Sequence, residues 1–197
     1  MRKLLCISFF VLLCSCSSIS LEEDPVVKNH FSESEIAFLD SILTFFDSEV
    51  VTQTSGTEII PSYKKLFQIV KGSMETDNPT IAIEIDQQKY QTLFSTLPDS
   101  FQQKLWYTGY VHDSRTNDST FFRDLGSSSN YASFLKTASE RNDFLFEYYD
   151  DLEHGASITP SMNANMLLFP EKLDIEKERE RLIYAVHFIT LLRPSAH

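Results

Sequence analysis

Apolar residues at helical spacing run through most of this chain, and they constrain its fold more than any other feature. Ser32 and Glu35 fit the capping box that starts a helix. Apolar side chains then recur three or four residues apart, at Ile36, Leu39, Leu43, Phe46 and Val50. The same spacing returns in segments that begin near Pro61, Asp86, Pro98, Asn130, Pro160 and Asp174. Because the segments differ in length and sustain no heptad, the pattern predicts a mainly α domain, an irregular array of five to seven helices.

In the second half of the chain, the sequence predicts one long helix and a final helix whose first turns are highly charged. Residues 130–152 carry a continuous apolar stripe, which predicts one long helix ending at His154-Gly155. The last helix is predicted to begin at Asp174, with Ile175, Leu182, Ile183, Val186 and Ile189 facing inward. Its first turns read EKERER, where Glu178 and Arg181 are spaced for an ion pair along the helix surface.

Two stretches interrupt the helical pattern. Isoleucines alternate with other residues over 80–85, which predicts one short strand, although Asn78-Pro79 could equally start a helix. Residues 110–130 are rich in Asp, Ser, Thr and Asn and predict the longest loop of the domain. Long loops in compact domains are often functional.

The N-terminus has the layout of an export signal. Arg2 and Lys3 precede a ten-residue apolar run, residues 4–13, which is too short for the roughly 20 residues that span a bilayer. A basic start followed by a short apolar run is typical of a cleaved signal peptide. The next residues, Leu13-Cys14-Ser15-Cys16, resemble the lipobox of bacterial lipoproteins.

This resemblance implies a lipid anchor on Cys16. In lipoproteins the cysteine carries a diacylglycerol thioether, the chain is cleaved before it, and the new N-terminus usually receives a fatty acid such as palmitate. Ser17, rather than Asp, after the cysteine implies sorting to the outer membrane, on its periplasmic or its surface side. The chain would then divide into a signal peptide (1–15), the lipidated cysteine with a flexible tether (16–30) and one helical domain (31–197).

The net charge limits the kinds of partner that we expect, and the cysteine content limits the kinds of covalent and metal site. The formal charge is −11, and removing residues 1–15 deletes two cations and no acid, which gives −13. Such a surface disfavours nucleic acid and anionic lipid heads, so the membrane contact would be the lipid itself, and a protein partner would be basic. Cys6 and Cys14 lie in the removed segment, which excludes disulfides and cysteine-based zinc sites from the mature domain.

Three groups of polar residues are weak candidates for catalysis. His112-Asp113 resembles the metal-binding dipeptide of HD phosphohydrolases, although residues 31–111 lack the upstream histidine that this family needs. Asp150 and His154 share a helix face and could bind one metal ion, with Asp151 and Glu153 beside them. Because two ligands are fewer than a metal site needs, the alternative is a helix end exposed to solvent. Asp143 and Glu147 form a carboxylate pair of the kind that glycosidases use across a cleft, or an acidic solvated face. No cofactor motif or nucleophile motif is present, and none is predicted.

Aromatic residues gather beside the polar stretch. Trp106, Tyr107 and Tyr110 could stack against a sugar or a partner protein, or could pack in the core. Asp118-Ser119-Thr120 resembles a bacterial O-glycosylation sequon, with Ser119 as the acceptor.

These observations favour a membrane-anchored envelope protein that acts as a protein-binding or accessory module without enzymatic activity. The alternative is an envelope hydrolase acting on glycan or peptidoglycan through the acids of residues 143–153 and His112 or His154. The hydrolase requires these groups to converge in one pocket.

Overall fold

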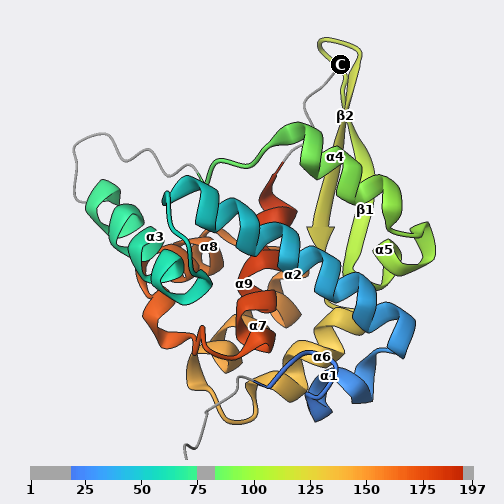
Figure 1. Cartoon of the computed structure of the whole chain (residues 1–197). Helices are drawn as coiled ribbons and strands as arrows, with labels where there is room; N and C mark the ends of the chain where they lie inside the picture. The colour runs from blue at the N-terminus through green and yellow to red at the C-terminus, as the bar shows by residue number, and fades with distance from the viewer. Residues whose placement is uncertain (1–18, 75–82, 193–197) are drawn as a thin grey trace, which may run out of the picture.

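The computed structural model describes residues 19–74 and 83–192, which form a mainly helical fold with one two-stranded antiparallel sheet (Figure 1). In this part of the chain there are nine α-helices, more than the five to seven that we predicted. The elements are α1 (Pro25–His30), α2 (Glu33–Gln53), α3 (Ile59–Met74), α4 (Gln87–Thr96), α5 (Asp99–Leu105), β1 (Trp106–Asp113), β2 (Asp118–Leu125), α6 (Asn130–Ser139), α7 (Asp143–Gly155), α8 (Pro160–Leu168), a 3-10 turn (Pro170–Lys172) and α9 (Glu178–Leu191).

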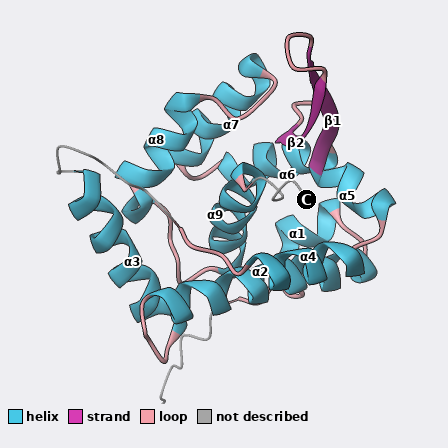
Figure 2. Ribbon diagram, turned by 90° about the horizontal axis from the view of Figure 1, so that it is seen from above, coloured by secondary structure: helices cyan, strands magenta, loops and turns pink. Residues whose placement is uncertain are grey.

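Helix α9 is the centre of the fold, and the other helices surround it (Figures 1 and 2). Every residue from Glu180 to Thr190 is buried. The inward positions predicted from the sequence are all buried, and Tyr184, Ala185 and Phe188 on the remaining sides are buried too. The helix is therefore enclosed on all sides rather than amphipathic. It starts at Glu178 instead of Asp174, because residues 174–177 form turns.

The N-terminal segment is part of the domain, contrary to the flexible tether that we expected up to residue 30. Leu21 and Val27 are buried, and residues 25–30 form α1. Asp24 caps this helix by accepting hydrogen bonds from the Val26 and Val27 backbone, and Pro25 occupies its first turn. Asp24-Pro25 is an ordinary helix-start signal, which an interpretation based on the acidic composition missed.

The charged start of α9 holds the N-terminal segment in place. Glu178 accepts a hydrogen bond of 2.9 Å from the Leu21 backbone N–H. Arg179 binds both carboxylate oxygens of Asp24. The Glu178–Arg181 pair predicted along the helix surface is present only as a long contact of 3.9 Å. The EKERER sequence thus serves mainly contacts with distant segments.

Glu180 and Arg181 connect α9 to two further parts of the fold. Glu180 accepts from the Asp174 backbone N–H at 2.7 Å and from the Asn142 side chain at 3.2 Å. Arg181 pairs with Asp47 of α2 at 3.4 Å, and Asp47 also accepts a hydrogen bond from the Tyr63 hydroxyl. Burial raises the pKa of the Asp47 carboxyl, and Arg181 opposes that rise.

Three other expectations are corrected by the structure. The predicted loop over 110–130 contains most of an antiparallel hairpin, β1 and β2. The predicted helix over 130–152 is two helices, because the Asn142 side chain caps a new helix at Phe144 and Leu145. The predicted strand over 80–85 is absent from residues 83–85, which have no regular structure, and its first residues lie outside the described range.

Candidate functional site

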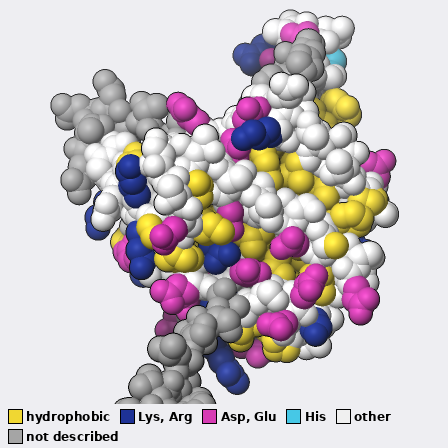
Figure 3. Space-filling model, in the orientation of Figure 1, with side chains coloured by type: hydrophobic (Ala, Val, Ile, Leu, Met, Phe, Trp, Pro, Cys, Tyr) yellow, Lys and Arg dark blue, Asp and Glu magenta, His cyan; other side chains and the backbone are white. Residues whose placement is uncertain are grey.

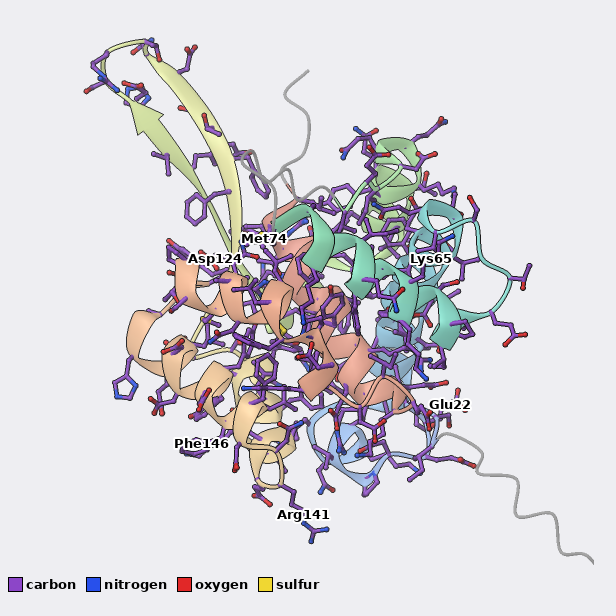
Figure 4. All side chains as sticks on the ribbon, turned by 90° about the vertical axis from the view of Figure 1, so that its left-hand side faces the viewer. Glu22, Lys65, Met74, Asp124, Arg141 and Phe146 are labelled. Carbon is purple, nitrogen blue, oxygen red and sulfur yellow. The ribbon has the colours of Figure 1, made fainter. Side chains whose placement is uncertain are left out.

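The hairpin β1–β2 extends away from the helical body, at the end opposite to α1 (Figures 1 and 4). Its turn is closed by a hydrogen bond of 2.8 Å from the Asn117 N–H to the Asp113 carbonyl, and Asn117 takes a left-handed conformation, φ 62°. The Asp113 carboxylate accepts a further hydrogen bond from the Arg115 N–H. Asp and Asn favour such turns, and aromatic and β-branched residues favour the strands on either side.

The strand register divides the hairpin side chains between two faces. Tyr110 lies opposite Phe121, and Thr108 lies opposite Arg123 on the same face. Tyr107 and Phe122 share the other face with Val111. The Tyr110 and Phe121 rings meet edge to face at 5.6 Å, and the Tyr107 and Phe122 rings do so at 5.5 Å.

The outer part of the hairpin carries large apolar side chains in solvent. Tyr107, Tyr110 and Val111 are 62%, 72% and 60% exposed, and hydrophobic atoms are visible on the projecting hairpin in Figure 3. No helix among the described residues covers the outer part of this ribbon (Figures 1 and 2). Two-stranded hairpins are marginal by themselves, so this one depends on its packed base.

The base of the hairpin is fixed to the core. Trp106 is 2% exposed, and its indole N–H donates to the Thr190 hydroxyl of α9 at 2.7 Å. Asp124 accepts from the Ile158 N–H at 2.9 Å, which joins β2 to the loop between α7 and α8. Of the aromatic residues proposed for binding, Trp106 is therefore a core residue, whereas Tyr107 and Tyr110 are exposed.

Gly109 lets the Phe122 ring cross the hairpin. A Cβ atom at Gly109 would lie 2.8 Å from the Phe122 ring, closer than such atoms approach. The glycine and the ring thus form a cross-strand pair, in which the aromatic side chain covers the position without a side chain. This pair fixes the position of Phe122 beside Tyr107.

A shallow pocket of about 330 Å³ lies at the base of β1. Its lining includes residues with hydroxyl or amide groups, namely Gln103, Tyr107, Thr108, Ser128 and Ser129. Trp106 and Gly126 complete it. The candidate site therefore consists of an exposed aromatic ribbon with a polar recess at its foot.

Arg123 lies between the hairpin and α4. Its guanidinium carbon is 3.7 Å from the centre of the Phe94 ring and 5.1 Å from that of Trp106. Its Nη1 donates to the Tyr90 hydroxyl. Burial lowers the pKa of the Arg123 guanidinium from its ordinary value, and Tyr90 partly opposes this change.

The four candidate catalytic residues lie in two separate places. His112 and Asp113 are at the outer end of β1, where His112 lies 3.3 Å from the Ser119 hydroxyl. Asp150 and His154 are in the last turns of α7, with 3.5 Å between His154 Nδ1 and the Asp150 carboxylate. His154 also lies 2.8 Å from the Asp150 carbonyl oxygen, and this contact raises the pKa of His154. No contact in the described part of the chain joins the two pairs, so they do not form one site.

The acidic residues of α7 form a solvated row. Asp143, Glu147, Asp150 and Glu153 are exposed, and Phe146 beside them is 56% exposed on the outer side of the helix (Figure 4). No group of three or more His, Cys, Asp or Glu among the described residues could hold a metal ion. Asp143 and Glu147 line none of these four pockets among the described residues, so the pockets give no support to a glycosidase mechanism.

His187 is a buried histidine that the sequence did not indicate as a site residue. His187 of α9 is fully buried, with the Tyr148 hydroxyl 3.0 Å from Nδ1 and the Asn163 side-chain oxygen 3.3 Å from Nε2. Burial lowers the pKa of His187 to about 3, so the imidazole is neutral. It accepts from the tyrosine and donates to the asparagine. Its spacing among apolar residues marked it only as part of a buried helix.

The residues predicted to be lipidated, to direct sorting or to be glycosylated lie only partly within the described range. Cys16 and Ser17 lie outside the described range. Ser119 is exposed on β2, where a modifying enzyme could reach it. None of the described helices combines the length and the apolar character needed to cross a bilayer.

Comparison with known proteins gives no relative for this chain. No family model, no curated protein and no solved structure matches it.

Proposed function

We propose that this chain is a lipid-anchored protein of the bacterial envelope, and that its hairpin β1–β2 binds another protein. The observation that carries the proposal is an exposed tyrosine on each face of a ribbon that extends beyond the helical body: Tyr110 in contact with Phe121 on one face, and Tyr107 in contact with Phe122 on the other. Exposed apolar groups cost free energy in water, and contiguous ones on a soluble domain usually mark interaction sites. Tyrosine is also among the residues that contribute most to protein interfaces.

The arrangement of the two ends supports this function. The segment that would follow the lipid anchor enters the fold at Leu21 and α1, and the hairpin lies at the other end of the molecule (Figures 1 and 4). An anchor at one end would present the hairpin away from the membrane surface. Outer-membrane sorting, which Ser17 implies, belongs to the same proposal.

The charge of the domain bears on the kind of partner. The acidic row on α7, together with the overall negative charge, would attract a protein of net positive charge and speed its approach. Acidic side chains are also spread over the face seen in Figure 3. A basic partner therefore remains our proposal, with the aromatic ribbon supplying the contact.

The alternative function, an envelope hydrolase acting on glycan or peptidoglycan, has no comparable support. Its acids and histidines would have to surround one pocket. Instead His112 and Asp113 lie on the hairpin and Asp150 and His154 on α7, and none of the described pockets is lined by these residues.

Site-specific photocrosslinking tests the proposal in the native envelope. A benzophenone amino acid replaces Tyr110, and in a matched control it replaces Ile69, which is 47% exposed on α3. We expect a discrete crosslinked protein from position 110 and none from position 69. Equal crosslinking from both positions, or none from position 110, would contradict a hairpin interface.

Metabolic labelling tests the anchor separately. Labelled palmitate should enter the wild-type chain and should fail to enter Cys16→Ala. A wild-type chain that takes up no label, and that is not processed before residue 16, would refute the lipoprotein assignment. The crosslinking result would still decide the role of the hairpin.

A further inference from the structure

Arg123 differs from the other partly buried cations of this protein. Four lysine or arginine side chains in the described part of the chain are buried or half-buried: Lys104, Arg123, Arg179 and Arg181. Lys104 pairs with Glu35, Arg179 with Asp24, and Arg181 with Asp47. No described carboxylate lies within ion-pair distance of Arg123, although the chain has 28 acidic residues. Burying a charge is costly unless it is paired.

The surroundings of Arg123 compensate this cost only in part. The Phe94 and Trp106 rings give cation–π attraction, and the Tyr90 hydroxyl accepts one hydrogen bond. The Nε atom is buried without a hydrogen-bond partner, as it is in Arg179 and Arg181, but those two side chains also have a carboxylate partner. A guanidinium offers five N–H donors in a fork that matches a carboxylate, and among the described residues only the Tyr90 hydroxyl accepts from Arg123.

The neighbouring part of the same hairpin face is exposed to solvent. The Arg123 side chain is half-buried, and Thr108, directly opposite in the register, is exposed and has no hydrogen-bond partner for its hydroxyl among the described residues. Toward the tip, Phe121 and then Tyr110 continue the face as an apolar surface. The cation is thus the inner end of an exposed aromatic strip.

We infer that Arg123 binds a carboxylate of the partner protein, carried by a segment whose apolar side chain packs on Phe121 and Tyr110. This inference rests on the proposed function and specifies the partner segment. Thr108 would donate a second hydrogen bond to the same carboxylate. This requires only one carboxylate on the partner at the position of contact, which is compatible with a partner whose net charge is positive.

A carboxylate fits this position better than a phosphate does. The site is lined by aromatic rings, and a dianion loses more solvation free energy there than a monoanion. The negative charge of the whole domain also repels a dianion more strongly.

Benzoate, an aromatic carboxylate, is a suitable probe of the site. It is titrated into the full chain in detergent micelles, with benzamide as the neutral analogue of the same shape. Trp106 is the only tryptophan, so its indole N–H signal in ¹H–¹⁵N NMR spectra reports on a ring next to Arg123. We expect saturable shifts of this signal and of the Arg123 Nε–H with benzoate, and at least tenfold weaker binding of benzamide.

Matched variants assign the binding to the cation. Arg123→Gln should weaken benzoate binding at least tenfold, whereas Arg115→Gln, in the turn of the same hairpin, should leave it unchanged. Because Arg123→Gln also removes the contact with Tyr90, Thr108→Val serves as a second variant that keeps the cation, and it should weaken binding severalfold. Equal binding of benzoate and benzamide, or unchanged binding in Arg123→Gln, would overturn the inference.

A third ligand separates the two kinds of anion. Phenyl phosphate binding more tightly than benzoate would refute the assignment to a carboxylate. If crosslinking from position 110 succeeds while benzoate does not bind, the inference fails and the proposed function stands. If benzoate binds while position 110 captures no protein, the proposed function fails.

Discussion

Arg179 Nη1 donates to both carboxylate oxygens of Asp24, at 3.0 and 2.8 Å, across 155 positions of sequence. Asp24 also caps α1, so one side chain both begins the first helix and fastens it to the central helix. Both partners are largely shielded from solvent, with 9% and 17% of their side chains exposed. An ion pair in such a place depends on both members being present.

Asp24→Asn should therefore destabilise the domain while it keeps the helix cap. Asparagine caps helices as well as aspartate does, so the change isolates the lost charge. We expect the free energy of unfolding in urea to fall by about 2 kcal/mol, because Arg179 is left without its counter-ion. The control is Asp174→Asn, whose exposed pair with Lys177 should contribute less than about 1 kcal/mol. Equal losses of unfolding free energy in Asp24→Asn and Asp174→Asn would mean that the shielded ion pair contributes no more to stability than the exposed one.

The pH dependence of stability should reveal His187. Its pKa is about 3 in the folded protein and 6.5 when unfolded, so between these values only the unfolded chain binds a proton. The contribution of His187 to the free energy of unfolding is fully present above pH 6.5. It is lost as the pH falls toward 3, by about 1.4 kcal/mol per pH unit. His187→Gln can still accept from Tyr148 and donate to Asn163, and it should flatten the urea-measured profile between pH 6.5 and 4.

An exposed histidine provides the comparison. The pKa of His154 is raised in the folded protein by its contacts with Asp150, so its contribution is present below pH 6.5 and is lost as the pH rises. His154→Gln should therefore leave the loss of stability on acidification in place. A profile that Gln at position 187 does not flatten would show that His187 is protonated in the folded state.

The sequence predicted the helical class because the apolar spacing around Ile36 and Val50 reflects burial directly. It could not predict the partners of the charged residues in α9. Glu178 and Arg179 look like a solvated helix surface, and only the fold brings Leu21 and Asp24 to them. Local spacing carries no information on contacts that are so distant in the sequence.

The candidate site was predicted in part. The aromatic residues near position 110 drew attention to the segment that forms the hairpin, but the hairpin itself was missed because its polar turn and short strands resemble a loop. Aromatic and β-branched residues on both sides of a polar stretch, with Asp113 and Asn117 at the turn, are the signal that favours a hairpin. The unpaired state of Arg123 could not be predicted, because it depends on which carboxylates the fold keeps away.

Gly109→Ala should disturb the hairpin surface without unfolding the domain. The added methyl group would meet the Phe122 ring at 2.8 Å, so the ring must leave its present position, in which it contacts Tyr107. We expect a loss of about 1–2 kcal/mol in urea unfolding and weaker crosslinking from position 110.

Gly72→Ala is the matched control for that substitution. Gly72 lies in α3 with nothing within 4 Å of an added Cβ, so alanine should stabilise the helix by up to about 1 kcal/mol and leave crosslinking unchanged. If Gly109→Ala crosslinks as well as the wild type does, the Phe122 side of the hairpin takes no part in binding.

The short distance between the proposed anchor and the fold should orient the domain on the membrane. Only residues 17–20 separate Cys16 from Leu21, which Glu178 holds, so the connection reaches at most about 18 Å. The mature chain would have no cysteine free for labelling, so Lys28→Cys on α1 and Ser114→Cys in the hairpin turn can each carry a donor dye. We expect stronger energy transfer to acceptor-labelled lipid from position 28 than from position 114 in reconstituted vesicles.

A second substitution tests whether the fastening of the N-terminal segment sets this orientation. Arg179→Gln removes the bond to Asp24, which is one of the two ties that hold the N-terminal segment on α9, so this segment should detach more easily and lengthen the connection. The difference in energy transfer between positions 28 and 114 should then shrink, while the palmitate label is retained. Equal transfer from the two positions in the wild-type chain would show that the domain rotates freely above the bilayer, and the hairpin would then have no fixed direction in which to meet its partner.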